Sequence, residues 1–117
     1  MSPRILMIED DADAREVLQF ALEAEGLPVA MAADGAEGIA LAATTRPDVV
    51  LVDLGLPGLD GYEVARRIRD TLGDRVRLIA LTGYGRSEDR QRTAEAGFDE
   101  HLLKPVDVDE ILSLLSD

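Results

Sequence analysis

Short apolar runs alternate five times with amphipathic stretches along this sequence, and this alternation constrains the fold more than any other feature. Most of the runs are continuously apolar rather than alternating with polar residues, which is typical of strands covered on both faces. The stretches between them place apolar residues at helical spacing, as Val64, Ala65 and Ile68 do. We expect strands at 4–8, 27–32, 48–53, 76–81 and 99–103, and helices at 13–25, 35–45, 61–72, 87–96 and 107–116.

A βα unit that repeats five times with short connections predicts an α/β fold. We expect a doubly wound (βα)5 sandwich of three layers, with a parallel five-stranded sheet between two layers of helices. Right-handed crossovers leave few topologies, and the flavodoxin-like strand order 2-1-3-4-5 is the one we expect. The chain has 117 residues, which suits a single domain over 1–117.

Two of the predicted helices have distinctive starts. The helix at 87–96 offers almost no large apolar face, and we expect Ser87 to be its N-cap. The helix at 13–25 follows an acidic run in which Asp11 and Asp13 are typical of a solvated helix entry. We expect Asp13 to be the N-cap there.

The charge balance excludes several classes of partner. The formal net charge is −12, from 24 acidic and 12 basic side chains, so we expect neither direct nucleic-acid binding nor attraction to an anionic membrane. The sequence has no cysteine, which excludes disulfides, thiolate catalysis and cysteine metal sites. The apolar run Ile5–Ile8 is too short for a signal peptide or a membrane span. The cytoplasm is therefore the expected compartment.

Carboxylates gather where the predicted strands end, which is the edge at which ligands bind in sheets of this kind. The first strand is followed by Glu9 and Asp10, and the third ends in Asp53. Because these two strands are neighbours in the expected order, all three carboxylates should share one pocket. The fourth strand leads into Thr82 and the fifth into Lys104, at the same edge.

This set of residues favours phosphoryl transfer to a carboxylate. Clustered carboxylates raise one another's pKa values unless a cation intervenes, and Mg²⁺ suits one or two carboxylates together with water and a phosphate. Lys104 supplies a positive charge, and the Thr82 hydroxyl supplies a donor for an oxygen anion. Gly83 leaves the backbone open to a bulky group. We therefore expect Asp53 to act as the nucleophile.

Four segments together resemble the receiver domain of two-component response regulators, and the resemblance covers the whole chain. They are "ILMIEDD", "VVLVDLGLPGLDGYEVARRIR", "LIALTGYG" and "AGFDEHLLKPVD". The resemblance implies a signalling phospho-acceptor rather than an enzyme, although such a domain assists its own phosphorylation and dephosphorylation. The implied donor is a phosphohistidine on a sensor histidine kinase or a histidine phosphotransfer protein, and the implied acceptor is Asp53.

The resemblance also implies how the site is divided among its residues. Asp10, Asp53 and the carbonyl of Gly55 would coordinate Mg²⁺ directly. Glu9 would act on the ion through water. Thr82 would hold a phosphoryl oxygen, and Lys104 would pair with it.

Two features of the sequence leave questions open. Gly55 stands two residues after the acceptor, where many relatives carry a side chain, and Tyr84 stands two residues after the threonine. These positions modulate how water reaches the acyl phosphate, so its lifetime stays open. The segments "LTGYG" and "LLKPVD" are similar to receivers fused to hybrid histidine kinases, so both a stand-alone protein and an excised piece are consistent with the sequence.

The resemblance implies a conformational switch as well. Thr82 would move toward the phosphoryl group, and His101 would rotate inward at a position where the family usually has Tyr or Phe. The surface of the fourth helix, fifth strand and fifth helix would then change, and a homodimer through it is one outcome. We expect the polar side of that surface to carry Arg86, Arg90 and Arg92. A half-buried structural histidine is an equally good interpretation of His101.

Three other functions fit the sequence less well. A degenerate receiver that serves as a constitutive docking module should have lost part of the acidic pair, acceptor, threonine or lysine, and all are present. A metal-dependent phosphatase with an aspartyl nucleophile typically has a second aspartate where this chain has Gly55. A flavin carrier would need a hydroxyl-rich phosphate loop after the first strand, where three acids would repel the phosphate.

Overall fold

A computed structural model of the chain describes residues 3–83 and 90–115. The parallel sheet has five strands in the order β2-β1-β3-β4-β5, so the predicted fold class and strand order are confirmed. The strands are β1 (Ile5–Ile8), β2 (Val29–Ala32), β3 (Val49–Asp53), β4 (Arg77–Thr82) and β5 (Glu100–Leu103). The helices are α1 (Ala12–Ala24), α2 (Gly35–Thr45), α3 (Gly61–Leu72), the 3₁₀ turn η1 (Gly73–Arg75), α4 (Arg90–Glu95) and α5 (Val108–Leu115).

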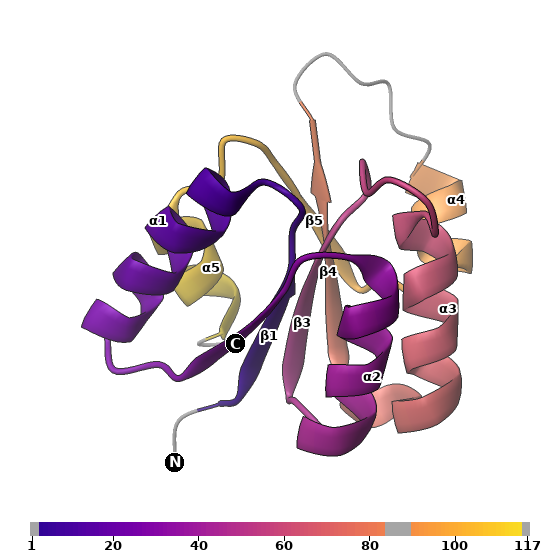
Figure 1. Ribbon diagram of the computed structural model, residues 1–117. Coiled ribbons are helices and arrows are strands. Elements are labelled where there is room, and N and C mark those ends of the chain that lie inside the picture. The colour runs from indigo at the N-terminus through magenta and orange to yellow at the C-terminus, as the bar shows by residue number, and fades with distance from the viewer. Residues whose placement is uncertain (1–2, 84–89, 116–117) are drawn as a thin grey trace.

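Helices cover both faces of the sheet, as Figure 1 shows, with α1 and α5 on one side and α2, α3 and α4 on the other. Each face has its own apolar cluster. The cluster beneath α1 and α5 includes Leu18, Leu22 and Ile111. The cluster beneath the other three helices is larger and also contains two aromatic residues, Tyr62 and Phe98.

Burial follows the position of each strand in the sheet. Every residue of β1 and β3 is buried, because these central strands have neighbours on both sides and helices on both faces. The edge strands β2 and β5 are only partly buried. Continuous apolar runs therefore correspond to buried strands at the centre of the sheet, which is where the site residues emerge.

Aspartates cap the helices that begin near the site. Asp11 caps α1, because its carboxylate accepts hydrogen bonds from the backbone N–H groups of Asp13 and Ala14. The expectation that Asp13 would be the cap is wrong, because the helix begins at Ala12 and Asp13 lies within its first turn. Asp60 caps α3 in the same way. The predicted cap at Ser87 lies outside the described residues.

The start of α3 packs directly against the end of β3. A Cβ atom at Gly61 would lie 2.8 Å from the carbonyl oxygen of Asp53 and 2.9 Å from the Cα of Leu54. Only glycine allows two backbone segments to approach this closely. The connection from Asp53 to α3 is therefore held tightly, which fixes the position of Asp53 at the carboxyl end of β3.

No helix among residues 3–83 and 90–115 is long and apolar enough to cross a membrane. The longest of them, α1, has 13 residues. At 1.5 Å per residue its length is about 20 Å, against about 30 Å for the hydrocarbon core of a bilayer.

Candidate functional site

Three carboxylates meet at the carboxyl ends of β1 and β3. The two strands pair with Ile8 opposite Val52, so Glu9 and Asp53 follow at the same level. One oxygen atom from each of Glu9, Asp10 and Asp53 lies within 4.8 Å of the others. Glu9 and Asp53 are buried, with 1% and 5% of their surface exposed, whereas Asp10 is exposed. The structure thus brings together the three acids that the strand order places side by side.

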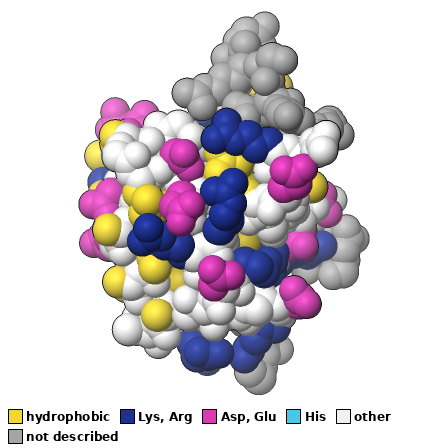
Figure 2. Space-filling view, turned by 90° about the vertical axis from the view of Figure 1, so that its right-hand side faces the viewer, with side chains coloured by type: hydrophobic (Ala, Val, Ile, Leu, Met, Phe, Trp, Pro, Cys, Tyr) yellow, Lys and Arg dark blue, Asp and Glu magenta, His cyan; other side chains and the backbone are white. Residues whose placement is uncertain are grey.

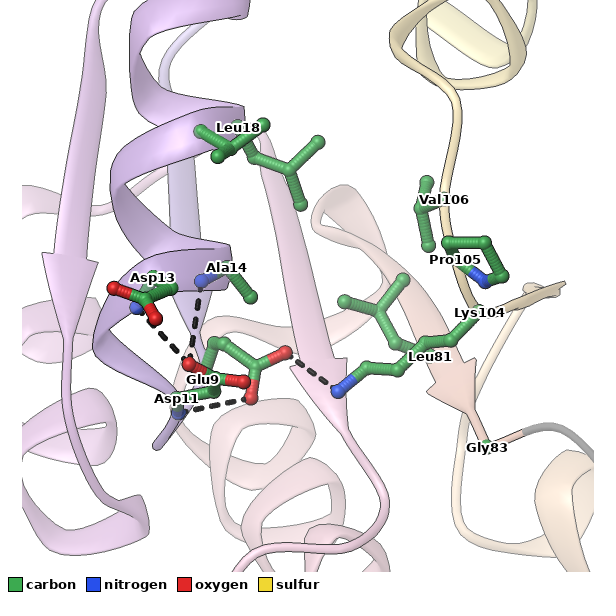
Figure 3. Close-up of a pocket in the computed structure, with 11 residues that line it drawn as sticks. Glu9, Asp11, Asp13, Ala14, Leu18, Leu81, Gly83, Lys104, Pro105 and Val106 are labelled. Atoms are coloured by element: carbon green, nitrogen blue, oxygen red, sulfur yellow. Dashed lines mark hydrogen bonds and ion pairs between the residues drawn. The ribbon is translucent and has the colours of Figure 1, made fainter.

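Lys104 directly follows the edge strand β5, and its side chain completes this cluster. Its Nζ lies 2.6 Å from Oε1 of Glu9 and 3.1 Å from Oδ2 of Asp53. Its backbone N–H donates to the carbonyl of Thr82 at 2.7 Å, which fixes the start of the side chain beside the end of β4. Figure 3 shows the side chain reaching from the segment after β5 toward Glu9. One ammonium group therefore faces two buried carboxylates.

The two buried carboxylates differ in their affinity for a proton. Burial raises the pKa of Glu9 to about 7, and its hydrogen bond with Asp53 adds to the rise. Burial alone would also raise the pKa of Asp53. Hydrogen bonds from Glu9, from the Gly55 N–H and from Lys104 outweigh burial and hold the pKa of Asp53 below its usual value. Below about pH 7 the pair therefore keeps a proton on Glu9 while Asp53 stays ionised.

The pKa of Lys104 is shifted in the direction that strengthens the pair. Burial alone would lower the pKa of the ammonium group, but its hydrogen bonds and attraction to Glu9 and Asp53 raise it instead. Lys104 is therefore charged throughout the neutral range. It offsets one of the negative charges that the cluster carries.

The cluster has the chemistry of a site for a divalent cation. Oε1 of Glu9 is buried and has no hydrogen bond of normal geometry, and the Lys104 ammonium lies 2.6 Å from it. Hard cations prefer carboxylate and carbonyl oxygens, and the three acids converge from two adjacent strands. Gly55 lies beside them, since its N–H donates to Oδ1 of Asp53 at 2.9 Å. The residues present could hold a metal ion.

Thr82 lies at the end of β4, in the strand next to Asp53. Its side chain is buried, and its hydroxyl donates to the carbonyl of Leu102 in β5 at 3.4 Å. In this structure the hydroxyl is therefore engaged with β5. This long hydrogen bond is a weak one, so the hydroxyl can exchange it for a stronger acceptor.

His101 occupies the second position of β5, opposite Ala80 of β4. Ala80 belongs to the apolar cluster beneath α2, α3 and α4. Because paired residues of parallel strands face the same side, the half-buried His101 lies on that side too. Thr82 is two residues after Ala80, so it shares this face with His101.

Of the three arginines expected on the polar side of α4, the structure describes one fully, one in part and one not at all. Arg86 and Tyr84 lie outside the described residues, and of Arg90 only its place at the start of α4 is described. Arg92 is exposed, but its guanidinium carbon lies 4.0 Å from the ring centre of Tyr62, so it faces α3. Figure 2 shows the side of the molecule formed by α3 and α4, where basic and acidic side chains are interspersed.

Arg15 contacts the site and was not expected from the sequence. Its Nη1 donates to the carbonyl oxygen of Glu9 at 2.7 Å. The signal in the sequence is weak, because a lone basic residue in the first turn of a helix has many uses. Only the geometry of the corner between β1 and α1 shows which carbonyl it reaches.

A cavity of about 570 Å³ opens beside the acidic cluster, between α1 and the segment that follows β5. Glu9 and Lys104 lie at its base, and apolar side chains point into it, as Figure 3 shows for Leu18, Leu81 and Val106. The outer surface of α1 continues this apolar lining with Val17 and Phe20, which are 66% and 76% exposed. These are large apolar residues in contact with water.

A family model for the response regulator receiver domain matches residues 5–116. The chain is 40% identical over 113 residues to the response regulator MprA of Mycobacterium sp. (strain KMS). The aligned region covers 97% of this chain and 49% of MprA. It is 39% identical over 112 residues to an uncharacterized 14.6 kDa protein of Leptolyngbya boryana, covering 95% of this chain and 86% of that protein. The chain thus spans about half the length of MprA and most of the Leptolyngbya protein.

Solved structures give the same result. The receiver domain of the sensor histidine kinase PA1611 from Pseudomonas aeruginosa PAO1, solved with a magnesium ion in its active site cleft, superposes with a TM-score of 0.88 at 35% identity, covering 99% of this chain and 96% of that one. A CheY-like receiver domain protein from Methanospirillum hungatei JF-1 gives a TM-score of 0.90 at 28% identity, covering 99% and 92%.

Proposed function

The chain belongs to the response regulator receiver domain family of two-component signalling, and we propose that it takes a phosphoryl group from a phosphohistidine onto Asp53. The observation that carries this proposal is the contact of one ammonium group, on Lys104, with two buried carboxylates, Glu9 and Asp53. A site that only stabilised the fold would have no need to bury two acids at the open edge of the sheet. The donor would be a sensor histidine kinase or a histidine phosphotransfer protein.

The residues of the site suit each part of the transfer. A bond forms between a carboxylate oxygen of Asp53 and phosphorus while the phosphorus–nitrogen bond of the phosphohistidine breaks. The electron pair of that bond stays on the imidazole nitrogen, which takes up a proton. Because the pKa of Asp53 is lowered, its carboxylate is ionised and ready to attack at neutral pH.

The side chains that would stabilise the new negative charge already lie at the site. Lys104 would pair with a phosphoryl oxygen, and the Thr82 hydroxyl would leave the Leu102 carbonyl to donate to another. Asp10, Asp53 and the Gly55 carbonyl would hold Mg²⁺, with Glu9 acting through water. When bound, the ion supplies neutralising charge for the phosphoryl oxygens.

The phosphohistidine would approach Asp53 from outside the carboxyl ends of the strands, alongside α1. Val17 and Phe20 are exposed in the middle of α1, and Asp13 and Glu16 line the same surface. An apolar centre with an acidic rim suits a partner surface that is apolar with a basic rim. We propose that the histidine-bearing partner packs against this part of α1.

The experiment that tests the acceptor is labelling by a small phosphodonor. Wild type incubated with acetyl phosphate and Mg²⁺ should gain the mass of one phosphoryl group, and hydroxylamine should remove it. Asp53→Asn should not gain it. Asp70→Asn changes an exposed aspartate on α3 and should label as wild type does.

The results separate the alternatives. Undiminished labelling of Asp53→Asn would refute the acceptor assignment. A wild type that is folded but never labelled, by acetyl phosphate or by a phosphorylated kinase, would favour the constitutive docking module instead.

A further inference from the structure

Arg15 holds the corner between β1 and α1 through a single backbone atom. Its Nη1 donates to the carbonyl of Glu9 at 2.7 Å, and the side chain is half-buried. Glu9 is the first residue beyond β1, and its N–H still bonds to the carbonyl of Ala32 in β2. The sheet therefore engages the N–H of Glu9, and the guanidinium of Arg15 engages its carbonyl group.

The peptide group that Arg15 fixes is the one that joins Glu9 to Asp10. The side chain of Glu9 has further supports, since Oε2 accepts from the Asp11 N–H at 3.2 Å and Oε1 faces Lys104. The exposed side chain of Asp10 accepts no hydrogen bond from the described residues. Its place relative to Asp53 therefore depends on the peptide groups on either side of Asp10. The Asp11 N–H bond to Glu9 engages the following one, and Arg15 engages the preceding one.

The location of Arg15 is electrostatically unfavourable for α1. It is the fourth residue of the helix, near the positive end of the helix dipole, where a cation is disfavoured. It forms no ion pair with the acids of the described segments, although the chain has 24 acidic residues. A favourable charge interaction on the helix does not account for it, whereas the bond to the Glu9 carbonyl does.

We propose that Arg15 is a positioning residue for the cation site. It sets the Glu9–Asp10 peptide so that the Asp10 carboxylate converges with Asp53. This inference rests on the proposed function, because the cation is the Mg²⁺ of that proposal. Its rival is that Arg15 acts by charge alone, and the two differ in sign, because a nearby positive charge by itself opposes the binding of a cation.

The test is the Mg²⁺ affinity of the full chain, measured by calorimetry. If Arg15 positions the corner, Arg15→Met should weaken binding by roughly tenfold, as the loss of groups that orient metal ligands does. Arg15→Lys, which keeps a donor but not the planar fork, should fall between. If only charge matters, Arg15→Met should bind more tightly than wild type and Arg15→Lys should match it.

Arg4 provides a matched control, because its Nη1 donates to the carbonyl of Thr45 at 2.8 Å, at the opposite end of β1 from the acids. Arg4→Met loses the same kind of bond, and its Mg²⁺ affinity should equal that of wild type. Urea midpoints without metal show whether each variant is folded. If Arg15→Met does not fold, Arg15→Lys alone still decides between weaker and unchanged binding.

Salt gives a second readout. Raising it from about 0.1 to 1 M shortens the Debye length from about 10 to 3 Å, so an effect of charge should fade and an effect of position should persist. Equal or tighter Mg²⁺ binding by Arg15→Met overturns the inference and leaves the proposed function intact. A wild type that binds no Mg²⁺ overturns both.

Discussion

The guanidinium carbon of Arg92 lies 4.0 Å from the centre of the Tyr62 ring, so a cation–π contact joins α4 to α3. The ring of Tyr62 also meets Phe98 edge-on, with centroids 6.5 Å apart. The six residues of α4 include no large apolar side chain, and the sequence therefore predicts a weakly anchored helix. This contact supplies an anchor that the apolar pattern does not reveal.

The first prediction is that Arg92 and Tyr62 are energetically coupled. A double-mutant cycle with Arg92→Gln and Tyr62→Leu should give a coupling free energy of about 0.5–1 kcal/mol, since Arg92 is exposed to water although the Tyr62 ring is buried. Urea unfolding of the four proteins measures it. Arg75→Gln, at an exposed position in η1, should be additive with Tyr62→Leu. Additivity of the Arg92 and Tyr62 changes would show that the contact contributes nothing.

The sequence is sufficient to predict which acids meet, because this depends only on where strands end and which strands are neighbours. Glu9 and Asp53 each follow an apolar run, and the crossover rules place those runs side by side. The sequence does not reveal which carboxylate keeps the proton. That depends on how strongly burial opposes each charge, and on the Gly55 N–H, which donates to Asp53. Lys104 lies closer to Glu9, at 2.6 Å, than to Asp53, at 3.1 Å, and by itself it favours the charged form of Glu9.

Arg15 and Arg92 illustrate a second limit. Both are single charged residues on helix surfaces, where the usual interpretation is a solvated side chain. Arg15 reaches a carbonyl six residues earlier, and Arg92 reaches a ring on another helix. Contacts of this kind arise from the angles at which helices pack on the sheet, and hydrophobic periodicity carries no information on them.

The second prediction concerns the pH dependence of stability without metal. The pKa of Glu9 rises from 4.5 to about 7 on folding. The folded state therefore binds more protons than the unfolded state between these values, and the stability contributed by the proton on Glu9 is lost as the pH rises through 7. The shift corresponds to roughly 3 kcal/mol at most. The lowered pKa of Asp53 acts in the opposite sense, but only in more acidic solution.

Urea unfolding with a chelator present, between about pH 5 and 8, measures this loss. Glu9→Gln keeps the shape of the side chain and removes its titration, so its stability should be nearly flat over the same range. Glu63→Gln provides a control, because Glu63 pairs with Arg66 and Arg67 on the surface of α3. A wild-type profile that is flat or rises with pH would contradict the assignment of the proton to Glu9.

The third prediction is that Mg²⁺ stabilises the chain and releases protons. A ligand that binds only the folded state adds about 2.7 kcal/mol at 100 times its Kd. Because the ion competes with the proton on Glu9, its affinity should increase with pH up to about 7 and then level off. Calorimetry in two buffers with different ionisation enthalpies gives the number of protons released.

Asp10→Ala should remove most of the stabilisation by Mg²⁺. Asp34→Ala is unsuitable as a control because Asp34 caps α2, whereas Asp70→Ala changes an exposed acid on α3 and should leave the effect intact. Equal melting temperatures with and without Mg²⁺ at matched ionic strength would refute metal binding by the folded chain.

The last prediction concerns His101 and the surface formed by α4, β5 and α5. When the Thr82 hydroxyl leaves the Leu102 carbonyl for a phosphoryl oxygen, space opens on the face of the sheet that Thr82 shares with His101. His101 should move into it, and beryllofluoride with Mg²⁺ should therefore change the amide exchange or NMR shifts of residues 90–103.

The side chain at this position should set how strongly the response propagates. An imidazole is more polar than a phenyl ring and costs more to bury. His101→Phe should therefore respond more strongly than wild type, and His101→Ala should respond weakly. A wild type whose residues 90–103 do not respond would refute the route through β5, and an unchanged response in His101→Ala would show that His101 is a structural histidine.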